Sequence, residues 1–165
     1  VSTSCFVPKS HTPFQWEAQN TQEEYLRKVT LLREHMRNKS ITYNWHDPET
    51  SYLEAVLSRG DRRIADVIEE AWRHGAKFDS WSEYFNLQTW LTAMETCGVS
   101  PAFYANRVRE KVEILPWHVI SDGVKESYLW RERETAYAGK ITPDCKVKCS
   151  GCGANKLCKG GICHG

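Results

Sequence analysis

The feature that most constrains this chain is the run of cysteines at its C-terminal end. Five of the seven cysteines lie between Asp144 and Cys163. This density is typical of short metal-binding knots and not of ordinary loops. Glycines between the cysteines permit the tight curvature that points successive thiolates at one ion or cluster. The interspersed lysines favour ionised thiolates, because their charge offsets that of the sulfur ligands. The tail is therefore predicted to bind a metal.

The predicted ligands are Cys145, Cys149, Cys152 and Cys158, with Cys163 as the alternative fourth ligand. Three interpretations stay open for these residues alone: a disulfide cluster, a structural zinc site and an iron–sulfur cluster. Cysteine spacing separates zinc from iron–sulfur poorly. Disulfides are disfavoured because nothing else in the chain indicates a secreted protein.

Length and composition predict a globular chain with a core of its own. It has 165 residues, of which 41% are hydrophobic and 12% aromatic. The net charge of +1 does not indicate nucleic acid as a partner. No apolar run reaches the ~20 residues that span a bilayer, so we expect no membrane and a cytoplasmic location. Because the chain starts at Val1, without methionine and inside an expected strand, we expect a piece of a longer protein.

Periodicity and capping residues predict a mainly α-helical fold with a minor β element. Strands are expected at residues 1–8 and 40–45, and the first needs a partner either from the second or from residues upstream of Val1. The expected helices cover 21–39, 49–58 after Asp47, Asp61 to Gly75, Ser80 or Ser82 to Gly98, a short one from Ser100, and 124–138.

Two faces of these helices carry specific expectations. The buried face of the helix between Asp61 and Gly75 is expected to consist of Ile64, Val67, Ile68, Ala71 and Trp72. The charged residues 131–134 of the last helix are expected to form a solvated face rather than a site.

Five segments occur together in a fixed order along the chain. They are Phe6 to Trp16 (FVPKSHTPFQW), Arg59 to Arg63 (RGDRR), Gly75 to Asp79 with Trp81, Leu115 to Trp117 (LPW), and the Asp144-Cys145 tail. With these segments the chain resembles the C-terminal part of a family of cobalamin-binding-domain radical S-adenosylmethionine (SAM) proteins, from Val1 to the tail. His118 departs from the family pattern, in which an acidic residue usually follows the Leu-Pro-Trp segment.

The resemblance implies a different role for each of three parts of the chain. Residues 1–20 would be a late strand of a radical SAM α/β barrel with its active-site loop, 21–139 a helical C-terminal extension with one short strand, and 140–165 the metal-binding tail. Lys9, His11 and Gln15 would face SAM or substrate. The single histidine of this loop also has a purely structural interpretation, which is the commoner role of an isolated histidine. The catalytic residues themselves stay unknown.

The partners implied by the resemblance lie upstream of Val1. They are the N-terminal cobalamin-binding region and the barrel, whose own CxxxCxxC motif holds a four-iron four-sulfur cluster and uses SAM. This chain would not be catalytic alone, and its substrate stays open because fold and cofactors fix radical initiation only. Membership of such a family favours an auxiliary iron–sulfur cluster on the tail, with zinc as the alternative.

An alternative of another class fits the same sequence. A helical module with a structural zinc knot would bind protein or RNA through its basic tail and exposed aromatic residues. A CxxxCxxC motif upstream of Val1 distinguishes the first function from this one.

Overall fold

The computed structural model describes residues 1–156, and these form two compact units. Unit 1 consists of Val1–Val7 and Ala18–Val108, and unit 2 of Pro8–Glu17 together with the described residues from Arg109 onward. Residues 8–17 therefore group with the C-terminal part of the chain, a long-range pairing that the sequence pattern does not anticipate. Cys158 and Cys163 lie outside the described residues.

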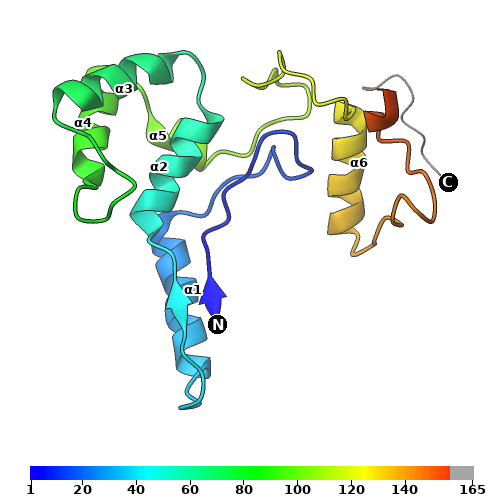
Figure 1. The fold of residues 1–165 in the computed structure, drawn as a ribbon, viewed down its shortest axis with the longest axis horizontal. Helices are drawn as coiled ribbons and strands as arrows, with labels where there is room; N and C mark the ends of the chain where they lie inside the picture. The colour runs from blue at the N-terminus through cyan, green and yellow to red at the C-terminus, as the bar shows by residue number, and fades with distance from the viewer. Residues whose placement is uncertain (157–165) are drawn as a thin grey trace. The chain divides into compact units, whose positions relative to one another are not determined.

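A small parallel sheet lies at the start of unit 1. β1 (Ser2–Thr3) pairs with β2 (Asn44–Trp45), with Ser2 opposite Asn44, and α1 (Gln22–His35) lies in the connection between them. Figure 1 shows both arrows near α1, and the Tyr25 hydroxyl of α1 donates to the His46 carbonyl just after β2 at 3.1 Å. The described residues are thus mainly helical with a minor β element, as predicted, although each strand is shorter than expected.

Side-chain caps set where the first two helices begin. The Thr21 hydroxyl accepts a hydrogen bond from the Glu24 amide at 3.3 Å at the start of α1. The Asp47 carboxylate accepts from the Glu49 amide at 2.6 Å at the start of α2 (Pro48–Arg59). Both caps satisfy helix amides that have no intrahelical partner, and both predictions are confirmed.

The remaining helices of unit 1 are α3 (Arg63–Arg73), α4 (Leu87–Thr96) and α5 (Pro101–Ala105). Gly75 has φ +93° after α3 and Gly98 has φ +65° after α4, the left-handed conformation predicted for residues that end helices. The expected start of α4 at Ser80 or Ser82 is wrong. Residues 78–84 form turns instead, and the Asn86 side chain caps α4 by accepting from the Gln88 amide at 2.9 Å.

The core of unit 1 is formed by α2, α3, α4 and α5. Its buried members include Leu53, Val56, Ile64, Val67, Ala71, Leu87, Trp90, Met94, Val99 and Tyr104. The prediction for the buried face of α3 is wrong for two residues, because Ile68 is 48% exposed and Trp72 is 68% exposed. The buried stripe runs through Ile64, Val67 and Ala71, and one narrow stripe suffices because α3 packs mainly against one helix, α4.

One charged side chain is completely buried in unit 1. Arg59, at the end of α2, has an exposed fraction of 0%. Its Nε donates to the Tyr104 carbonyl at 2.8 Å, and its Nη2 donates to the Arg107 carbonyl at 3.4 Å. The guanidinium thus satisfies the Tyr104 carbonyl, one of the last carbonyls of α5 that lack an intrahelical donor, and the Arg107 carbonyl just beyond the helix.

Unit 2 is built around α6 (Glu126–Tyr137) and a small aromatic core. The core consists of Trp16, Leu115, Trp117 and Leu129. Trp16 is 0% exposed, and its ring contacts that of Trp130 edge to face with centroids 5.0 Å apart. A short 3₁₀ turn, η1 (Ala154–Lys156), is the last described element.

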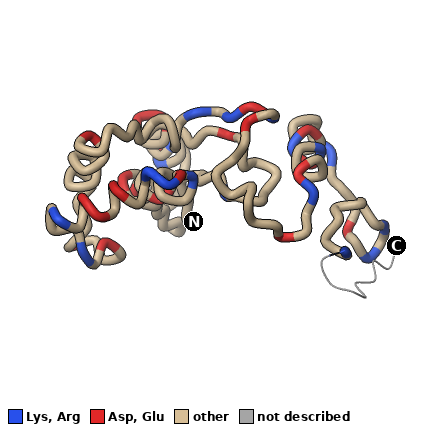
Figure 2. Tube along the Cα trace, turned by 90° about the horizontal axis from the view of Figure 1, so that it is seen from above, with Lys and Arg blue, Asp and Glu red and all other residues tan. Residues whose placement is uncertain are grey.

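The expectation of a solvated face at residues 131–134 is wrong in part. Figure 2 shows acidic and basic residues mixed along α6. The Arg133 Nε nevertheless pairs with the Glu17 carboxylate at 2.5 Å, and both side chains are more than four-fifths buried. The Glu132 carboxylate accepts from the Thr142 hydroxyl at 2.6 Å. These two charges therefore tie the flanking loops to α6, which periodicity does not reveal.

None of the described helices combines the length and apolarity needed to cross a membrane.

Candidate functional site

The loop at residues 8–17 folds into successive turns that fix its polar groups. The Thr12 hydroxyl donates to the Lys9 carbonyl at 2.7 Å, and the Gln15 amide donates to the Thr12 carbonyl at 3.1 Å. His11 adopts φ +55°, a left-handed conformation that few residues with a side chain take. The turns bring the side chain of Gln15 back against the backbone of His11.

Gln15 is the polar centre of this part of the molecule. It is 2% exposed, and its Oε1 accepts from the His11 amide at 3.0 Å and from the Trp117 Nε1 at 2.7 Å. The Arg109 guanidinium lies over the Trp117 ring, 5.1 Å from its centroid. These two hydrogen bonds to the buried Gln15 Oε1 hold the loop against the Leu-Pro-Trp segment.

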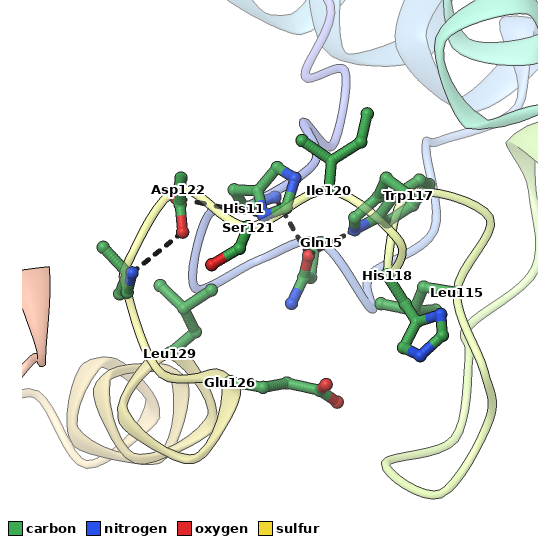
Figure 3. A pocket seen from close by; sticks show the side chains of 11 residues that line it. His11, Gln15, Leu115, Trp117, His118, Ile120, Ser121, Asp122, Glu126 and Leu129 are labelled. Atoms are coloured by element: carbon green, nitrogen blue, oxygen red, sulfur yellow. Dashed lines mark hydrogen bonds and ion pairs between the residues drawn. The ribbon is translucent and has the colours of Figure 1, made fainter. Parts of the chain in front are cut away.

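A pocket of about 160 Å³ lies between these segments and the start of α6. Figure 3 shows Gln15 between His11 and Trp117 at its inner wall. The other lining residues are Leu115, His118, Ile120, Ser121, Asp122, Val124, Glu126 and Leu129. This volume is close to the ~150 Å³ cavity that accommodates benzene, so the pocket suits one small group.

Two imidazoles and two carboxylates give the pocket its chemistry. The His11 Nδ1 lies 3.9 Å from the Asp122 Oδ2. The other oxygen of Asp122 accepts from the Val124 amide at 2.9 Å, which fixes this carboxylate at the entrance to α6. His118 and Glu126 line the same pocket. Imidazole and carboxylate groups bind polar ligands by hydrogen bonds.

The structure brings two of the three predicted loop residues to the pocket. His11 and Gln15 line it, whereas Lys9 is exposed and does not. Sequence reasoning missed Asp122 and Glu126, although Asp122-Gly123 is a dipeptide typical of turns. No local signal in the sequence pairs residue 11 with residue 122.

The described cysteines of the tail occupy two different environments. Cys149 and Cys152 are half-buried in a segment that bends at Gly153, and two of its glycines have positive φ, Gly151 at +73° and Gly153 at +99°. We call residues 149–153 the cysteine turn. Cys145 is exposed, on a turn held by the Asp144 carboxylate, which accepts from the Lys146 amide at 2.8 Å. Across residues 1–156, no three side chains of Cys, His, Asp or Glu gather to hold a metal. The donor chemistry of the Cys149–Cys152 pair fits zinc or iron–sulfur, and the full ligand set stays a prediction.

The turn at 149–153 is fixed to α6 from both of its sides. The Lys125 amide donates to the Cys152 carbonyl at 2.8 Å, and Arg131 Nη2 donates to the Ser150 carbonyl at 2.5 Å. Gly153 is buried against this helix start: a Cβ there would lie 2.9 Å from the Lys125 Cγ and 3.1 Å from the Gly123 carbonyl oxygen. A side chain at residue 153 would therefore require the Lys125 side chain and the Gly123 carbonyl to shift, in addition to the strain of a positive φ.

Comparison with protein-family models, with curated proteins and with solved structures finds no match to this chain.

Proposed function

We propose that this chain is the C-terminal part of a radical SAM enzyme that also contains a cobalamin-binding region. The observation that supports this most is the β1–α1–β2 unit, in which a helix connects two parallel strands. Parallel pairs are typical of larger α/β sheets and barrels, because two strands alone are marginally stable. Among the described residues β1 pairs only with β2, so a barrel strand from the rest of the enzyme has an edge to join.

The position of the pocket residues in the chain supports the same proposal. His11 and Gln15 lie in the connection that follows β1 and precedes α1. In α/β barrels the loops that follow the strands carry the chemistry. We infer that the pocket receives part of SAM or of the substrate, held by His11, Asp122 and the surrounding apolar walls. The cluster and SAM, when bound upstream, supply the radical, and these side chains bind and orient the reacting molecule.

Changing His11 in the complete protein tests the role of the pocket. We expect His11→Asn to lower substrate turnover at least about tenfold, the lower part of the range for a lost polar active-site group. Asparagine tolerates the left-handed backbone of residue 11, so the melting temperature should stay close to that of wild type. The measurements are 5′-deoxyadenosine formation under reducing conditions, product formation and thermal unfolding.

His35→Ala is the matched control for this experiment, because His35 is exposed at the end of α1. Normal product formation by His11→Asn contradicts the pocket's role while leaving the family proposal intact. A complete protein that never cleaves SAM reductively contradicts the family proposal itself.

We further propose that the tail binds an iron–sulfur cluster, with zinc as the alternative. The support is the pair of half-buried cysteines, Cys149 and Cys152, which are separated by two residues as in many metal sites. Gly151 and Gly153 beside them have positive φ, which lets the chain curve tightly. When bound, a cluster supplies an electron-transfer centre, whereas zinc supplies only structural stability. The role of this chain is to present the sulfur ligands on a fixed turn.

Anaerobic reconstitution decides between the two metals. We expect broad visible absorption with bound iron and sulfide, lost when Cys145, Cys149 or Cys152 becomes serine. Cys5→Ser and Cys97→Ser are the controls, and both should keep the cluster; desolvation raises the pKa of the Cys97 thiol, which disfavours its ionisation. Colourless protein with one tightly bound zinc selects the alternative, and disulfides in freshly isolated protein contradict both metals.

A further inference from the structure

We propose that the cysteine turn at 149–153 is the outer support of the His11 pocket, so that a metal on the turn and a ligand in the pocket stabilise each other's binding. This inference rests on the proposed metal site of the tail. It assigns that site a second task within unit 2, namely to fix the segment that carries Asp122 and Glu126.

A backbone hydrogen bond joins the cysteine turn to the wall of the pocket. The Cys152 carbonyl accepts from the Lys125 amide at 2.8 Å. Lys125 stands between Val124 and Glu126, and both of these residues line the pocket. A displacement of the Cys152 carbonyl therefore acts on the pocket wall without any intervening side chain.

The second contact is steric and lies one residue further along the tail. Gly153 is buried so closely that a Cβ would come within 3.1 Å of the Gly123 carbonyl oxygen. Gly123 separates Asp122 from Val124, and Asp122 is a further residue of the pocket wall. The tail thus packs on the backbone of the turn that aims the Asp122 carboxylate toward His11.

The other side of the cysteine turn is fixed to the same helix. The Ser150 carbonyl accepts from Arg131, and the Ser150 Oγ lies 3.3 Å from the Tyr128 hydroxyl. Tyr128 also packs against the core of Trp16, Trp117 and Leu129 beneath the pocket. The turn is therefore attached at both ends, and its shape and the position of the first turns of α6 depend on each other.

A bound metal would set that shape. Gly151 and Gly153 have large conformational freedom in the absence of a constraint, so ordering them opposes docking of the turn. A metal on Cys149 and Cys152 fixes the distance between the two sulfurs and removes much of this freedom. Because coupling between two sites is reciprocal, a ligand that orders the pocket wall strengthens metal binding by the same factor. The usual range for such coupling starts at about fivefold.

Hydrogen–deuterium exchange on the complete protein measures this coupling directly. Protein loaded with zinc or with the reconstituted cluster is compared with chelated protein, and peptides covering 120–126 and 9–16 are followed. We expect the metal to slow exchange in the 120–126 segment at least about fivefold. Peptides from α4 in unit 1 serve as the internal reference and should not change.

Two glycine variants separate support of the pocket from strain in the turn. Gly151→Ala and Gly153→Ala both place a side chain at positive φ, but the new Cβ at residue 151 would meet nothing within 4 Å, whereas the one at residue 153 would lie within 3.1 Å of both Lys125 and Gly123. We expect Gly153→Ala to speed exchange in the 120–126 segment at least about fivefold at equal metal content, and Gly151→Ala to leave it near the wild-type rate. Cys152→Ser provides a second route to the same loss if Gly153→Ala does not fold.

The outcomes distinguish this inference from the proposal on which it rests. Equal exchange in loaded and chelated wild-type protein, at full metal content, overturns the support role and leaves the metal site standing. Wild-type protein without any bound metal overturns both the support role and the metal site, and a metal assay of the purified protein measures this directly. Equal effects of Gly151→Ala and Gly153→Ala also overturn the inference, because packing against Gly123 and Lys125 would then be irrelevant.

Discussion

Replacing Arg59 by methionine should lower the free energy of unfolding of unit 1 by about 3 kcal/mol, the scale for removing one member of a buried hydrogen-bonded charge site. Methionine fills a similar volume but donates no hydrogen bond. The Tyr104 carbonyl, 2.8 Å from the Arg59 Nε in the folded protein, then loses this buried donor. Urea unfolding followed by far-ultraviolet circular dichroism measures the change.

Arg73→Met is the matched control, because Arg73 pairs with Glu69 on the surface and both side chains are more than half exposed. Exposed ion pairs contribute about 0–1 kcal/mol, so this variant should unfold close to wild type. Similar small losses for Arg59→Met and Arg73→Met would show that the buried guanidinium does not stabilise the α2–α5 contact.

Replacing Trp16 by alanine should destabilise unit 2 by about 3–5 kcal/mol, the range for truncating a buried tryptophan. The Trp16 ring is 0% exposed and contacts Trp130, so its loss leaves a cavity in a core that has four buried side chains among the described residues. The pocket should open at the same time, because Gln15 next to it is held by Trp117 of the same core. Unfolding curves recorded by near-ultraviolet circular dichroism report the loss.

Trp81→Ala controls for the removal of an indole as such, since Trp81 is 62% exposed in unit 1. It should change the free energy of unfolding by less than about 0.5 kcal/mol, as surface substitutions usually do. A Trp16→Ala protein as stable as Trp81→Ala would contradict the aromatic core as the basis of unit 2.

The features that sequence reasoning predicted correctly depend on neighbours in the chain. Thr21 and Asp47 cap helices through amides two or three residues away, and Gly75 and Gly98 end helices through their own backbone freedom. Such signals are complete within a few residues. The start of α4 was wrong because three aromatics at 81–85 mimic a helical face, although Asn86 carries the cap.

The features that sequence reasoning missed depend on residues far apart. The same periodicity places Ile68 and Val67 on the apolar side of α3, yet only Val67 is buried, because the width of the packed stripe is set by the neighbouring helix. The sequence predicts His11 and Gln15 as binding residues, but their closeness to Asp122 and Trp117 follows from chain contacts across more than 100 residues. One sequence alone contains no signal for such pairs.

The grouping of residues 8–17 with the C-terminal part of the chain affects how the protein is made. The Gln15 side chain cannot bond to Trp117 until the ribosome has added that residue, 102 residues later in the chain. At translation rates of about 5–20 residues per second, this interval lasts roughly 5–20 s. During it Trp16 has no core to enter, because the other described members of that core, Leu115, Trp117 and Leu129, all follow residue 108. Trp16 therefore stays exposed on the growing chain throughout this interval, and an exposed apolar side chain of this size favours non-native association until its core is complete.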